Sequence, residues 1–236
     1  MIQVVLHGAG RMSAALADAA GPDPDIEILA VVSPRPPAWE NSLLHHPSLD
    51  QLEVLPDVLI DFSLPRGTAA AAAWCADSGV ALLSGVTGLP AETHAQLDTA
   101  AEKIPVLWAP NLSIGVNLMA QLCATAAAVL GPDVPVSIDD LHHSRKLDAP
   151  SGTALMLGAS LGRGRAHAGD QVSYNSRREG EAIGRHQLTF ELPGETLSLT
   201  HEALDRAIFA RGALQAARWL AGQANGRYSA ADWLAG

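Results

Sequence analysis

The sequence predicts an α/β protein with two parts, a doubly wound parallel sheet at the N-terminus and a smaller α+β part with a mixed sheet. Three observations support this fold class. Strand-like and helix-like segments alternate over the first half of the chain, which is typical of a parallel sheet. A turn of small residues, Gly8–Gly10, separates the first strand from the first helix. After about residue 111 the alternation stops, and one long helix precedes several strands.

The first strand–helix–strand unit ends by residue 33. Ile2–His7 is a continuous apolar strand, and Arg11–Ala20 carries its apolar residues at helical spacing. Ile26–Val32 is rich in β-branched residues and therefore predicts a second strand. The proline-rich stretch that follows, residues 33–37, ends that strand because proline lacks a backbone N–H.

Further strand–helix repeats complete the first part. The alanine-rich stretch Gly67–Ser78 predicts a helix, because alanine has the highest helix propensity, and Gly79 is expected to cap its end. The other expected elements are strands at Val58–Phe62, Val80–Ser84 and Pro105–Ala109 and a helix at Ala91–Lys103.

The second part is expected to hold a helix followed by strands. The pattern predicts a helix at Gly115–Leu130 and strands at Val134–Leu141, Gln187–Leu192 and Thr196–His201, with a hairpin turn at Pro193-Gly194-Glu195. The last helical pattern, Asp205–Gly222, is free to return and pack on the first part. We therefore expect a dinucleotide-binding domain of residues 1–112 and about 209–236, and a second domain of residues 113–208.

Composition narrows the function classes. The formal net charge is −10, so the surface lacks the basic field that attracts nucleic acid or anionic lipid. The longest apolar run, Ala69–Ala76, is far shorter than the roughly 20 residues that span a bilayer. Cys75 and Cys123 lie in apolar segments without redox-pair spacing, and the histidine spacing predicts no metal site. We expect a cytoplasmic protein that binds neither nucleic acid nor membranes.

The glycine turn is a candidate cofactor site. Gly8-x-Gly10-x-x-Ser13 follows a strand and opens a helix, which is the context of the dinucleotide-binding fingerprint. Small residues let the backbone approach a pyrophosphate, and the helix N-terminus stabilises its charge. The alternative is an ordinary tight turn between a strand and a helix.

Other strand ends extend this candidate site. The second strand ends in Ser33-Pro34-Arg35, without the carboxylate that selects NAD, so NADPH is expected to bind at least as well as NADH. The alternative is that Arg35 is only a solvated loop residue without a role in nucleotide binding. Asp61–Pro65, Gly85–Gly88 and Ala109–Asn111 follow later strands and are expected on the same rim of the sheet, where ligands bind.

The stretch His142–Thr153 concentrates ionisable side chains. A histidine that titrates near neutral pH supplies an acid or a base, and Lys146 supplies a positive charge and a proton. Ser151 is expected to cap a helix over Ala154–Leu161, whose first N–H groups can bind a carboxylate. The alternative is a pair of surface histidines ahead of a capped helix.

This stretch, read as His142-His143-x-x-Lys146-x-Asp148-x-Pro150-Ser151-Gly152-Thr153-Ala154, resembles the signature segment of the 4-hydroxy-tetrahydrodipicolinate reductase family. The likeness continues in order along nearly the whole chain, at Gly8–Met12, Asp61–Pro65, Gly85–Gly88, Ala109–Asn117, Arg178–His186 and Phe209–Leu220.

The resemblance implies an NAD(P)H-dependent reductase of lysine and diaminopimelate biosynthesis. It implies a Rossmann-type domain with a C-terminal substrate and oligomerisation domain, assembled into homotetramers through the sheets of the second domain. His142 and Lys146 would be the catalytic proton donors or acceptors. A cyclic dicarboxylate would bind His143, Ser151, Gly152, Thr153 and Thr87, and NADPH or NADH would bind Gly8, Ala9, Gly10, Arg11, Met12, Ser33, Arg35, Gly85, Val86, Thr87, Ala109, Pro110, Asn111 and Leu112.

The sequence departs from the family pattern at a few positions. The glycine loop is one residue shorter than G-x-x-G-R-M-G, and Ser13 replaces its last glycine; Val86 and Ser63 each replace a threonine. Two alternatives stay open: another NAD(P)-dependent dehydrogenase of the same architecture, and a sensor that binds the nucleotide without catalysis.

Overall fold

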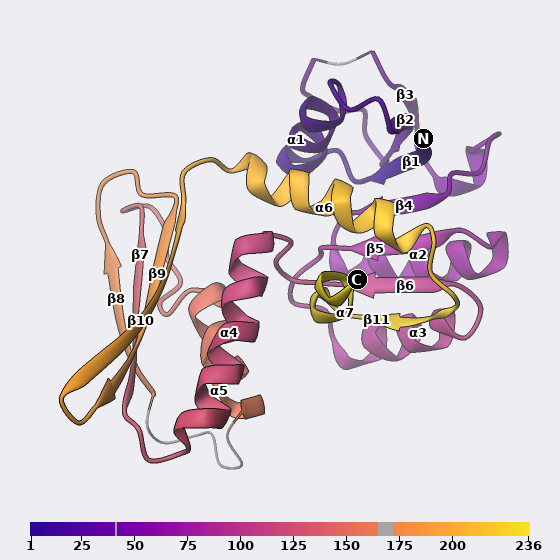
Figure 1. Cartoon of the computed structure of the whole chain (residues 1–236). Coiled ribbons are helices and arrows are strands. Elements are labelled where there is room, and N and C mark those ends of the chain that lie inside the picture. Colours follow the sequence, from indigo (N-terminus) through magenta and orange to yellow (C-terminus); the bar gives the residue numbers. More distant parts are fainter. Residues whose placement is uncertain (41, 165–171) are drawn as a thin grey trace. The chain divides into compact units, whose positions relative to one another are not determined.

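The computed structural model describes residues 1–40, 42–164 and 172–236, which form two compact units (Figure 1). The first unit contains Met1–Ser113 and Ala207–Gly236, and the second contains Ile114–Arg206. Among the described residues, no helix has the length and apolar character needed to cross a membrane.

The first unit is built on a seven-stranded sheet in the order β11-β6-β5-β4-β1-β2-β3, and every neighbouring pair is parallel. The strands are β1 (Ile2–His7), β2 (Ile26–Val32), β3 (Leu44–His46), β4 (Val58–Asp61), β5 (Ala81–Ser84), β6 (Pro105–Trp108) and β11 (Gly226–Tyr228). The chain runs outward from β1 to β3 and then returns to place β4 beside β1. This reversal creates the switch point at which open α/β sheets bind their ligands.

Helices cover both faces of this sheet. They are α1 (Arg11–Ala20), α2 (Pro65–Ser78), α3 (Ala91–Ala101), α6 (Ala207–Leu220) and α7 (Ala230–Ala235), with a short 3-10 helix at Leu49–Gln51. One apolar cluster joins Leu16 of α1 to Leu214 of α6, and a second joins Ala72 of α2 to Leu97 of α3. The C-terminal helix α6 therefore returns to the first unit, as the sequence suggested.

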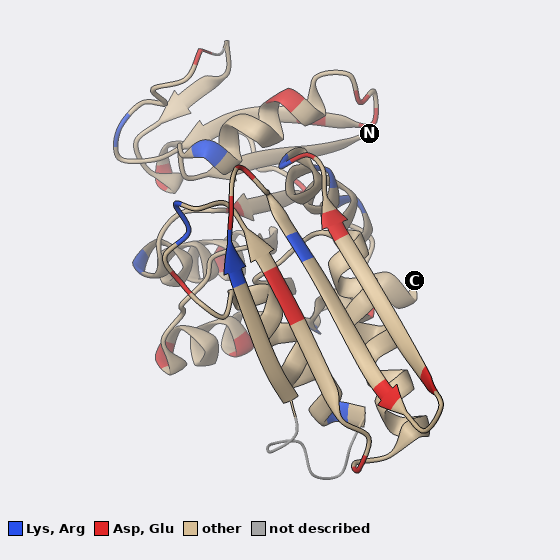
Figure 2. Cartoon of the chain, turned by 90° about the vertical axis from the view of Figure 1, so that its left-hand side faces the viewer, with Lys and Arg blue, Asp and Glu red and all other residues tan. Residues whose placement is uncertain are grey.

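The second unit pairs two helices with a mixed four-stranded sheet in the order β10-β9-β7-β8. The strands are β7 (Val136–His142), β8 (Val172–Arg178), β9 (Gly184–Leu192) and β10 (Glu195–Ala203), and the helices are α4 (Ile114–Leu130) and α5 (Gly152–Gly164). Strand β7 alternates buried and half-buried residues, so Ile138 packs with Leu157 of α5 in the core. Figure 2 looks onto the opposite face of this sheet.

The predicted fold class is confirmed, and several element ends differ. Helix α2 begins at Pro65, two residues before the predicted start, because proline fits the first helical position. The hairpin turn is confirmed, with the left-handed φ of +84° at Gly194. Strand β7 extends to His142, whereas the predicted strand ended at Leu141. Three strands and helix α7 were not predicted at all.

Candidate active site

The glycine turn lies at the carboxyl end of β1 and has two glycines with different roles. Gly8 adopts a φ of +105°, and a Cβ there would lie 2.8 Å from the backbone oxygen of Phe62. Only glycine fits this position without strain. Gly10 is the N-cap of α1, and no described heavy atom lies within 4 Å of the point where its Cβ would stand.

The turn has the features that a dinucleotide pyrophosphate requires. Within the described residues, no side chain caps the first N–H groups of α1, at Arg11 and Met12, so they can bind an anion. The open space at Gly10 allows a phosphate to approach the backbone. Ser13, buried in α1, donates its hydroxyl to the carbonyl of Gly8 at 2.7 Å and so closes the shortened turn.

The other predicted cofactor residues also follow strands of the first unit. A Cβ at Gly85 would collide with the Phe62 ring, so a larger residue in the turn after β5 would force that ring to move. The side chains of Val86, Ala109 and Leu112 are buried, and their turns are fixed from within: the carbonyl of Val86 accepts from the indole of Trp108 at 2.9 Å, and the N–H of Ala109 donates to the carbonyl of Ser84 at 3.1 Å. The remaining residues of these turns, Thr87, Gly88, Pro110 and Asn111, are exposed or half-buried.

Ser33 and Arg35 differ in how available they are to a ligand. The Ser33 side chain is buried and donates to the backbone oxygen of Arg35 at 2.6 Å. Nε2 of His45, on β3, lies 2.9 Å from the backbone oxygen of Ser33. The Arg35 side chain is exposed. Of the two predicted contacts at this strand end, Arg35 is therefore the one whose side chain can reach a nucleotide.

A buried carboxylate, Asp61, lies at the switch point; the sequence placed it on the rim of the sheet without predicting its role. Asp61, at the end of β4, accepts hydrogen bonds from the hydroxyls of Ser63, Thr68 and Ser84, and Nδ1 of His7 lies 3.0 Å away. Burial opposes its ionisation, but His7 and these hydroxyls outweigh burial and lower the pKa of Asp61. This network ties the ends of β1, β4 and β5 together beneath the glycine turn.

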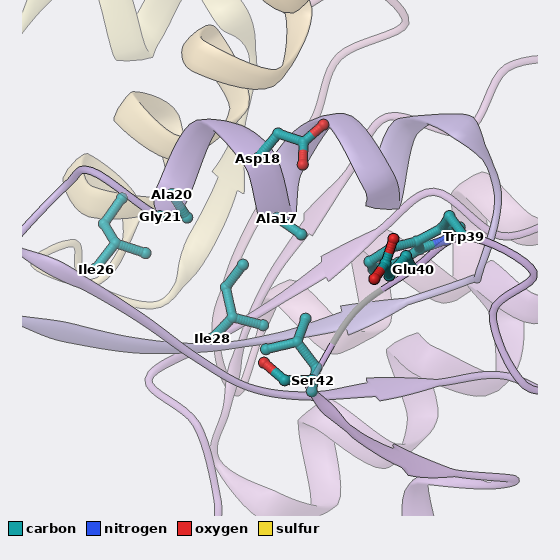
Figure 3. A pocket seen from close by; sticks show the side chains of 10 residues that line it. Ala17, Asp18, Ala20, Gly21, Ile26, Ile28, Trp39, Glu40 and Ser42 are labelled. Carbon is teal, nitrogen blue, oxygen red and sulfur yellow. The ribbon is translucent and has the colours of Figure 1, made fainter.

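A cavity of about 340 Å³ lies elsewhere in the first unit (Figure 3). Its walls come from the last turn of α1, the first residues of β2 and the segment around Trp39. Ile26 and Ile28, near the start of β2, line the cavity, whereas the predicted cofactor residues lie at the carboxyl ends of the strands. Trp39 itself donates its indole N–H to the carbonyl of Ala9 at 3.1 Å and so supports the glycine turn.

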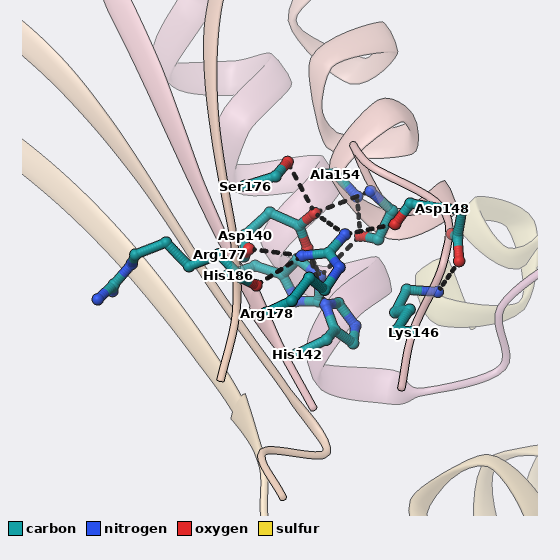
Figure 4. A network of polar contacts seen from close by, with 10 residues as sticks. Asp140, His142, Lys146, Asp148, Ala154, Ser176, Arg177, Arg178 and His186 are labelled. Carbon is teal, nitrogen blue, oxygen red and sulfur yellow. Dashed lines mark hydrogen bonds and ion pairs between the residues drawn. The ribbon is translucent and has the colours of Figure 1, made fainter. Parts of the chain in front are cut away.

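In the second unit, His142 ends β7 and is buried beside a carboxylate (Figure 4). Nδ1 of His142 lies 2.9 Å from Oδ1 of Asp140, without the angle of a hydrogen bond. The Asp140 side chain is fully buried, and Nε2 of His186 lies 3.4 Å from the same oxygen. Its second oxygen, Oδ2, accepts from Arg178 at 3.0 Å and from Ser176 at 3.2 Å.

These contacts set the charges of the group. Burial alone would raise the pKa of Asp140, but hydrogen bonds from Ser151 and Arg178 hold it at about 2. Burial lowers the pKa of His142, Asp140 opposes that effect, and the positive charges of Lys146 and Arg178 add to it. Burial likewise lowers the pKa of His186 to about 4. At neutral pH the group therefore contains an ionised carboxylate, a guanidinium and neutral imidazoles.

Lys146 lies on the loop that follows β7 and is paired with an acid. Its Nζ lies 2.7 Å from Oδ1 of Asp148, and the pair is partly exposed. On the same loop, Arg145 makes two hydrogen bonds to Glu181, at 2.8 and 2.6 Å. The carbonyl of the half-buried His143 accepts a hydrogen bond from the N–H of Lys146. The loop is therefore held to the turn between β8 and β9.

The Ser151-Gly152-Thr153 segment begins α5. The hydroxyl of Ser151 accepts from the N–H of Ala154 at 3.1 Å, which confirms the predicted cap. The side chain of Ser151 is buried, and its hydroxyl also lies 3.3 Å from Nε2 of His186. Gly152 is exposed and Thr153 half-exposed. The hydroxyl of Ser151 thus caps the N-terminus of α5, while Gly152 and Thr153 are more exposed.

The structure thus places the predicted nucleotide residues in the first unit. Thr87, which was also predicted to bind substrate, lies in the first unit too, apart from the other predicted substrate residues in the sequence. It brings His142, His143, Lys146 and Ser151–Thr153 together around the β7–α5 loop in the second unit. Asp140, Arg178 and His186 were not among the residues predicted to act in the site, although the likeness to the family included Arg178–His186. Ligand atoms of Asp140, His142 and His186 lie within 4.8 Å of one another, a cluster of metal-ligating types that linear spacing did not reveal.

A doubly wound sheet with a glycine turn at its switch point, together with a second unit that carries buried imidazoles and a lysine, defines the class of two-domain nicotinamide-dependent oxidoreductases. Comparison with known proteins narrows the class. The model of the dihydrodipicolinate reductase N-terminus matches residues 2–112, and that of the C-terminus matches residues 115–234. The chain therefore belongs to the dihydrodipicolinate reductase family, and the resemblance found in the sequence is confirmed.

Individual relatives agree with this membership. The 4-hydroxy-tetrahydrodipicolinate reductase of Stenotrophomonas maltophilia strain R551-3 is 42% identical over 241 residues, covering 99% of this chain and 98% of the relative. That of Xanthomonas euvesicatoria pv. vesicatoria is 41% identical over 236 residues, covering 98% and 97%. The solved dipicolinate-bound dihydrodipicolinate reductase from Paenisporosarcina sp. TG-14 superposes with a TM-score of 0.87 at 24% identity, over 98% of both chains, and shows the shared fold.

Proposed function

We propose that this protein reduces 4-hydroxy-tetrahydrodipicolinate to tetrahydrodipicolinate with NADPH or NADH, in the biosynthesis of diaminopimelate and lysine. The observation that carries the proposal is the buried His142 at the end of β7, followed by Lys146 and the capped start of α5, in a chain of this family. The overall reaction consumes one hydride and one proton and releases water. When bound, the reduced nicotinamide supplies the hydride.

The residues of the second unit supply the polar half of the reaction. Hydride addition places negative charge on the conjugated nitrogen side of the substrate ring, so a cation or acid that stabilises this charge lowers the barrier. The Lys146 ammonium and the His142 imidazole are the groups assigned to this role. The start of α5 at Ser151–Thr153, together with His143, is assigned to the substrate carboxylates, because a helix N-terminus favours an anion.

The residues of the first unit are assigned to the nucleotide. Gly8–Met12 would hold the pyrophosphate, and Arg35 would face the 2′-phosphate of NADPH. The turns Gly85–Thr87 and Ala109–Leu112 would present backbone groups to the nicotinamide end. In this proposal the unit of Met1–Ser113 and Ala207–Gly236 is the cofactor domain, and Ile114–Arg206 is the substrate domain.

Assembly and location belong to the same proposal. We infer a homotetramer built through the sheets of the second unit, which is supported by a sheet that α4 and α5 cover on one side only. We also propose a cytoplasmic location, where reduced nicotinamide nucleotides are available to a biosynthetic reductase. The mass in solution, measured by light scattering, tests the assembly.

The decisive experiment follows the absorbance band of the reduced nicotinamide. Purified protein is mixed with freshly generated substrate and with NADPH or NADH in parallel reactions. Substrate-dependent oxidation that is lost in Lys146→Ala supports the proposal and ranks the two nucleotides. If the nucleotide binds but no oxidation occurs while a control reductase is active, the protein is a related dehydrogenase with another substrate or a sensor without catalysis.

A further inference from the structure

We propose that Asp140 is a positioning residue that fixes the imidazole of His142 against the start of α5. This inference rests on the proposed function, because it assigns a role to a residue beside its proton-transferring group. The Asp140 carboxylate contacts both His142 and the backbone of Ser151: Oδ1 lies 2.9 Å from Nδ1 of His142, and Oδ2 accepts from the N–H of Ser151 at 2.8 Å.

The geometry of β7 makes this contact unavoidable. Side chains alternate between the faces of a strand, so Asp140 and His142, two residues apart, point to the same side. That side is the one that α4 and α5 cover, since Ile138 of the same strand lies in the apolar core with Leu157. Asp140 therefore stands between the core and His142, where its side chain has no exposure to water.

A buried charge in this position needs compensation, and the structure supplies it. Nη2 of Arg178, on β8, donates to Oδ2 of Asp140 at 3.0 Å, and Nη1 donates to its backbone oxygen at the same distance. Removing one partner of such a buried pair leaves an uncompensated charge. The pair thus works as one unit, in which Asp140 raises and Arg178 lowers the proton affinity of the neighbouring imidazole.

The groups around His142 give opposite predictions for the two partners. They are Asp140 on the same strand, Lys146 on the next loop, Arg178 on β8 and His186 on β9, whose ring centre lies 5.1 Å from that of His142. Loss of the Asp140 charge removes the interaction that favours the protonated imidazole, while the charges of Lys146 and Arg178 still oppose it, so His142 should titrate at lower pH. Loss of the Arg178 charge should move the titration to higher pH.

The test compares Asp140→Asn and Arg178→Gln with a matched control. Asp139→Asn makes the same chemical change one residue away, where the side chain faces the other side of the sheet and accepts from Asn175 at 2.7 Å. NMR follows the imidazole of His142, identified by its loss in His142→Asn. Parallel assays give kcat, KM and the pH–rate profile, and light scattering and thermal unfolding check assembly and fold.

In Asp140→Asn we expect the His142 midpoint to fall by roughly one pH unit. We expect kcat to fall about 10- to 100-fold, the usual result of a small misplacement of a reacting group, with a much smaller change in KM. The midpoint should rise in Arg178→Gln and stay unchanged in Asp139→Asn. Asp140→Glu, which restores the charge, should recover most of the midpoint shift.

Several results would overturn the inference. One is a folded Asp140→Asn with the parent kcat and midpoint, and another is a shift in the same direction in both variants. If Asp140→Asn does not fold, the inference is still overturned when the titration midpoint of His142 is unchanged or lowered in Arg178→Gln. Activity that is lost in EDTA and restored by Zn²⁺ would instead make Asp140, His142 and His186 a metal site. A protein that shows the opposite shifts but does not reduce the substrate would refute the proposed function and leave this inference standing.

Discussion

Exchanging each glycine of the β1–α1 turn for alanine should separate folding from nucleotide binding. In Gly8→Ala, the new Cβ would lie 2.8 Å from the backbone oxygen of Phe62 and 3.1 Å from the backbone nitrogen of Ser63, with a φ of +105°. Backbone atoms cannot swing away as a flexible side chain does. The left-handed conformation costs about 1–2 kcal/mol and the overpacking about 1–3 kcal/mol. We therefore expect Gly8→Ala to lose roughly 2–5 kcal/mol of unfolding free energy.

Gly10→Ala is the matched variant. The new Cβ meets three backbone atoms at Gly8 and none at Gly10. No described heavy atom lies within 4 Å of its new Cβ, and Gly10 has an extended φ of −85°. Its stability should change by less than about 1 kcal/mol, because alanine lowers the entropy of the unfolded chain but is less favourable than glycine at an N-cap. The same Cβ would occupy the space that a pyrophosphate needs, so the affinity for NADPH should fall.

Urea unfolding followed by circular dichroism gives the free energies, and nucleotide fluorescence gives the dissociation constants. We expect Gly8→Ala to be less stable than the parent protein. We expect Gly10→Ala to be about as stable as the parent but to bind NADPH more weakly. A Gly10→Ala protein with the parent affinity would show that the nucleotide does not approach this turn. A Gly8→Ala protein as stable as the parent would show that the turn relaxes away from Phe62.

Three further predictions concern single side chains. Removing the ammonium in Lys146→Met should lower kcat by roughly 10²- to 10⁴-fold, measured by nucleotide oxidation at saturating substrate, and an unchanged rate would contradict its role as an acid. Arg35→Asp should weaken NADPH relative to NADH, because it replaces an exposed cation by a carboxylate that repels the 2′-phosphate; equal changes in the two affinities would place the ribose elsewhere. The pKa of His186, about 4 in the folded chain, lies below its ordinary value of 6.5, so the native state stays neutral where the unfolded chain takes up a proton. Stability should therefore fall by up to about 3 kcal/mol as the pH drops from 6.5 to 4, and His186→Gln should flatten this dependence in thermal unfolding.

The sequence predicted the elements whose local signals are strong. Strands β1 and β2 and helix α1 match their predicted ranges, because their apolar periodicity and bounding glycines and prolines agree. Strand β8 was missed because Val172–Arg178 is polar and mostly exposed, without alternation of apolar and polar residues. It is a strand because β7 pairs with it, which no local pattern reveals. Strands β3 and β11, three residues each, are too short for a periodic signal.

The site residues divide in the same way. Residues within a continuous motif, such as His142, Lys146 and Ser151, could be proposed from the sequence because their neighbours in sequence are their neighbours in space. Arg178 and His186 reach Asp140 from other strands, and that register is visible only in the folded sheet. Asp140 itself had a usable signal. An acid two residues before a candidate histidine in a strand shares its face, but the predicted strand ended at Leu141 and so excluded His142.

The two ion pairs beside His142 in the second unit differ in burial, and this difference determines which cation can change its partner. The Lys146–Asp148 pair is partly exposed, with 56% exposure at Asp148, and such pairs contribute at most about 1 kcal/mol. The Lys146 ammonium can therefore leave Asp148 at small cost and turn toward the charge that would develop on the substrate nitrogen. The Arg178–Asp140 pair is buried, so breaking it would leave a charge without water or partner. The partly exposed Lys146, on the loop that follows His142, can therefore change its partner. The buried Arg178 must keep Asp140 as its partner.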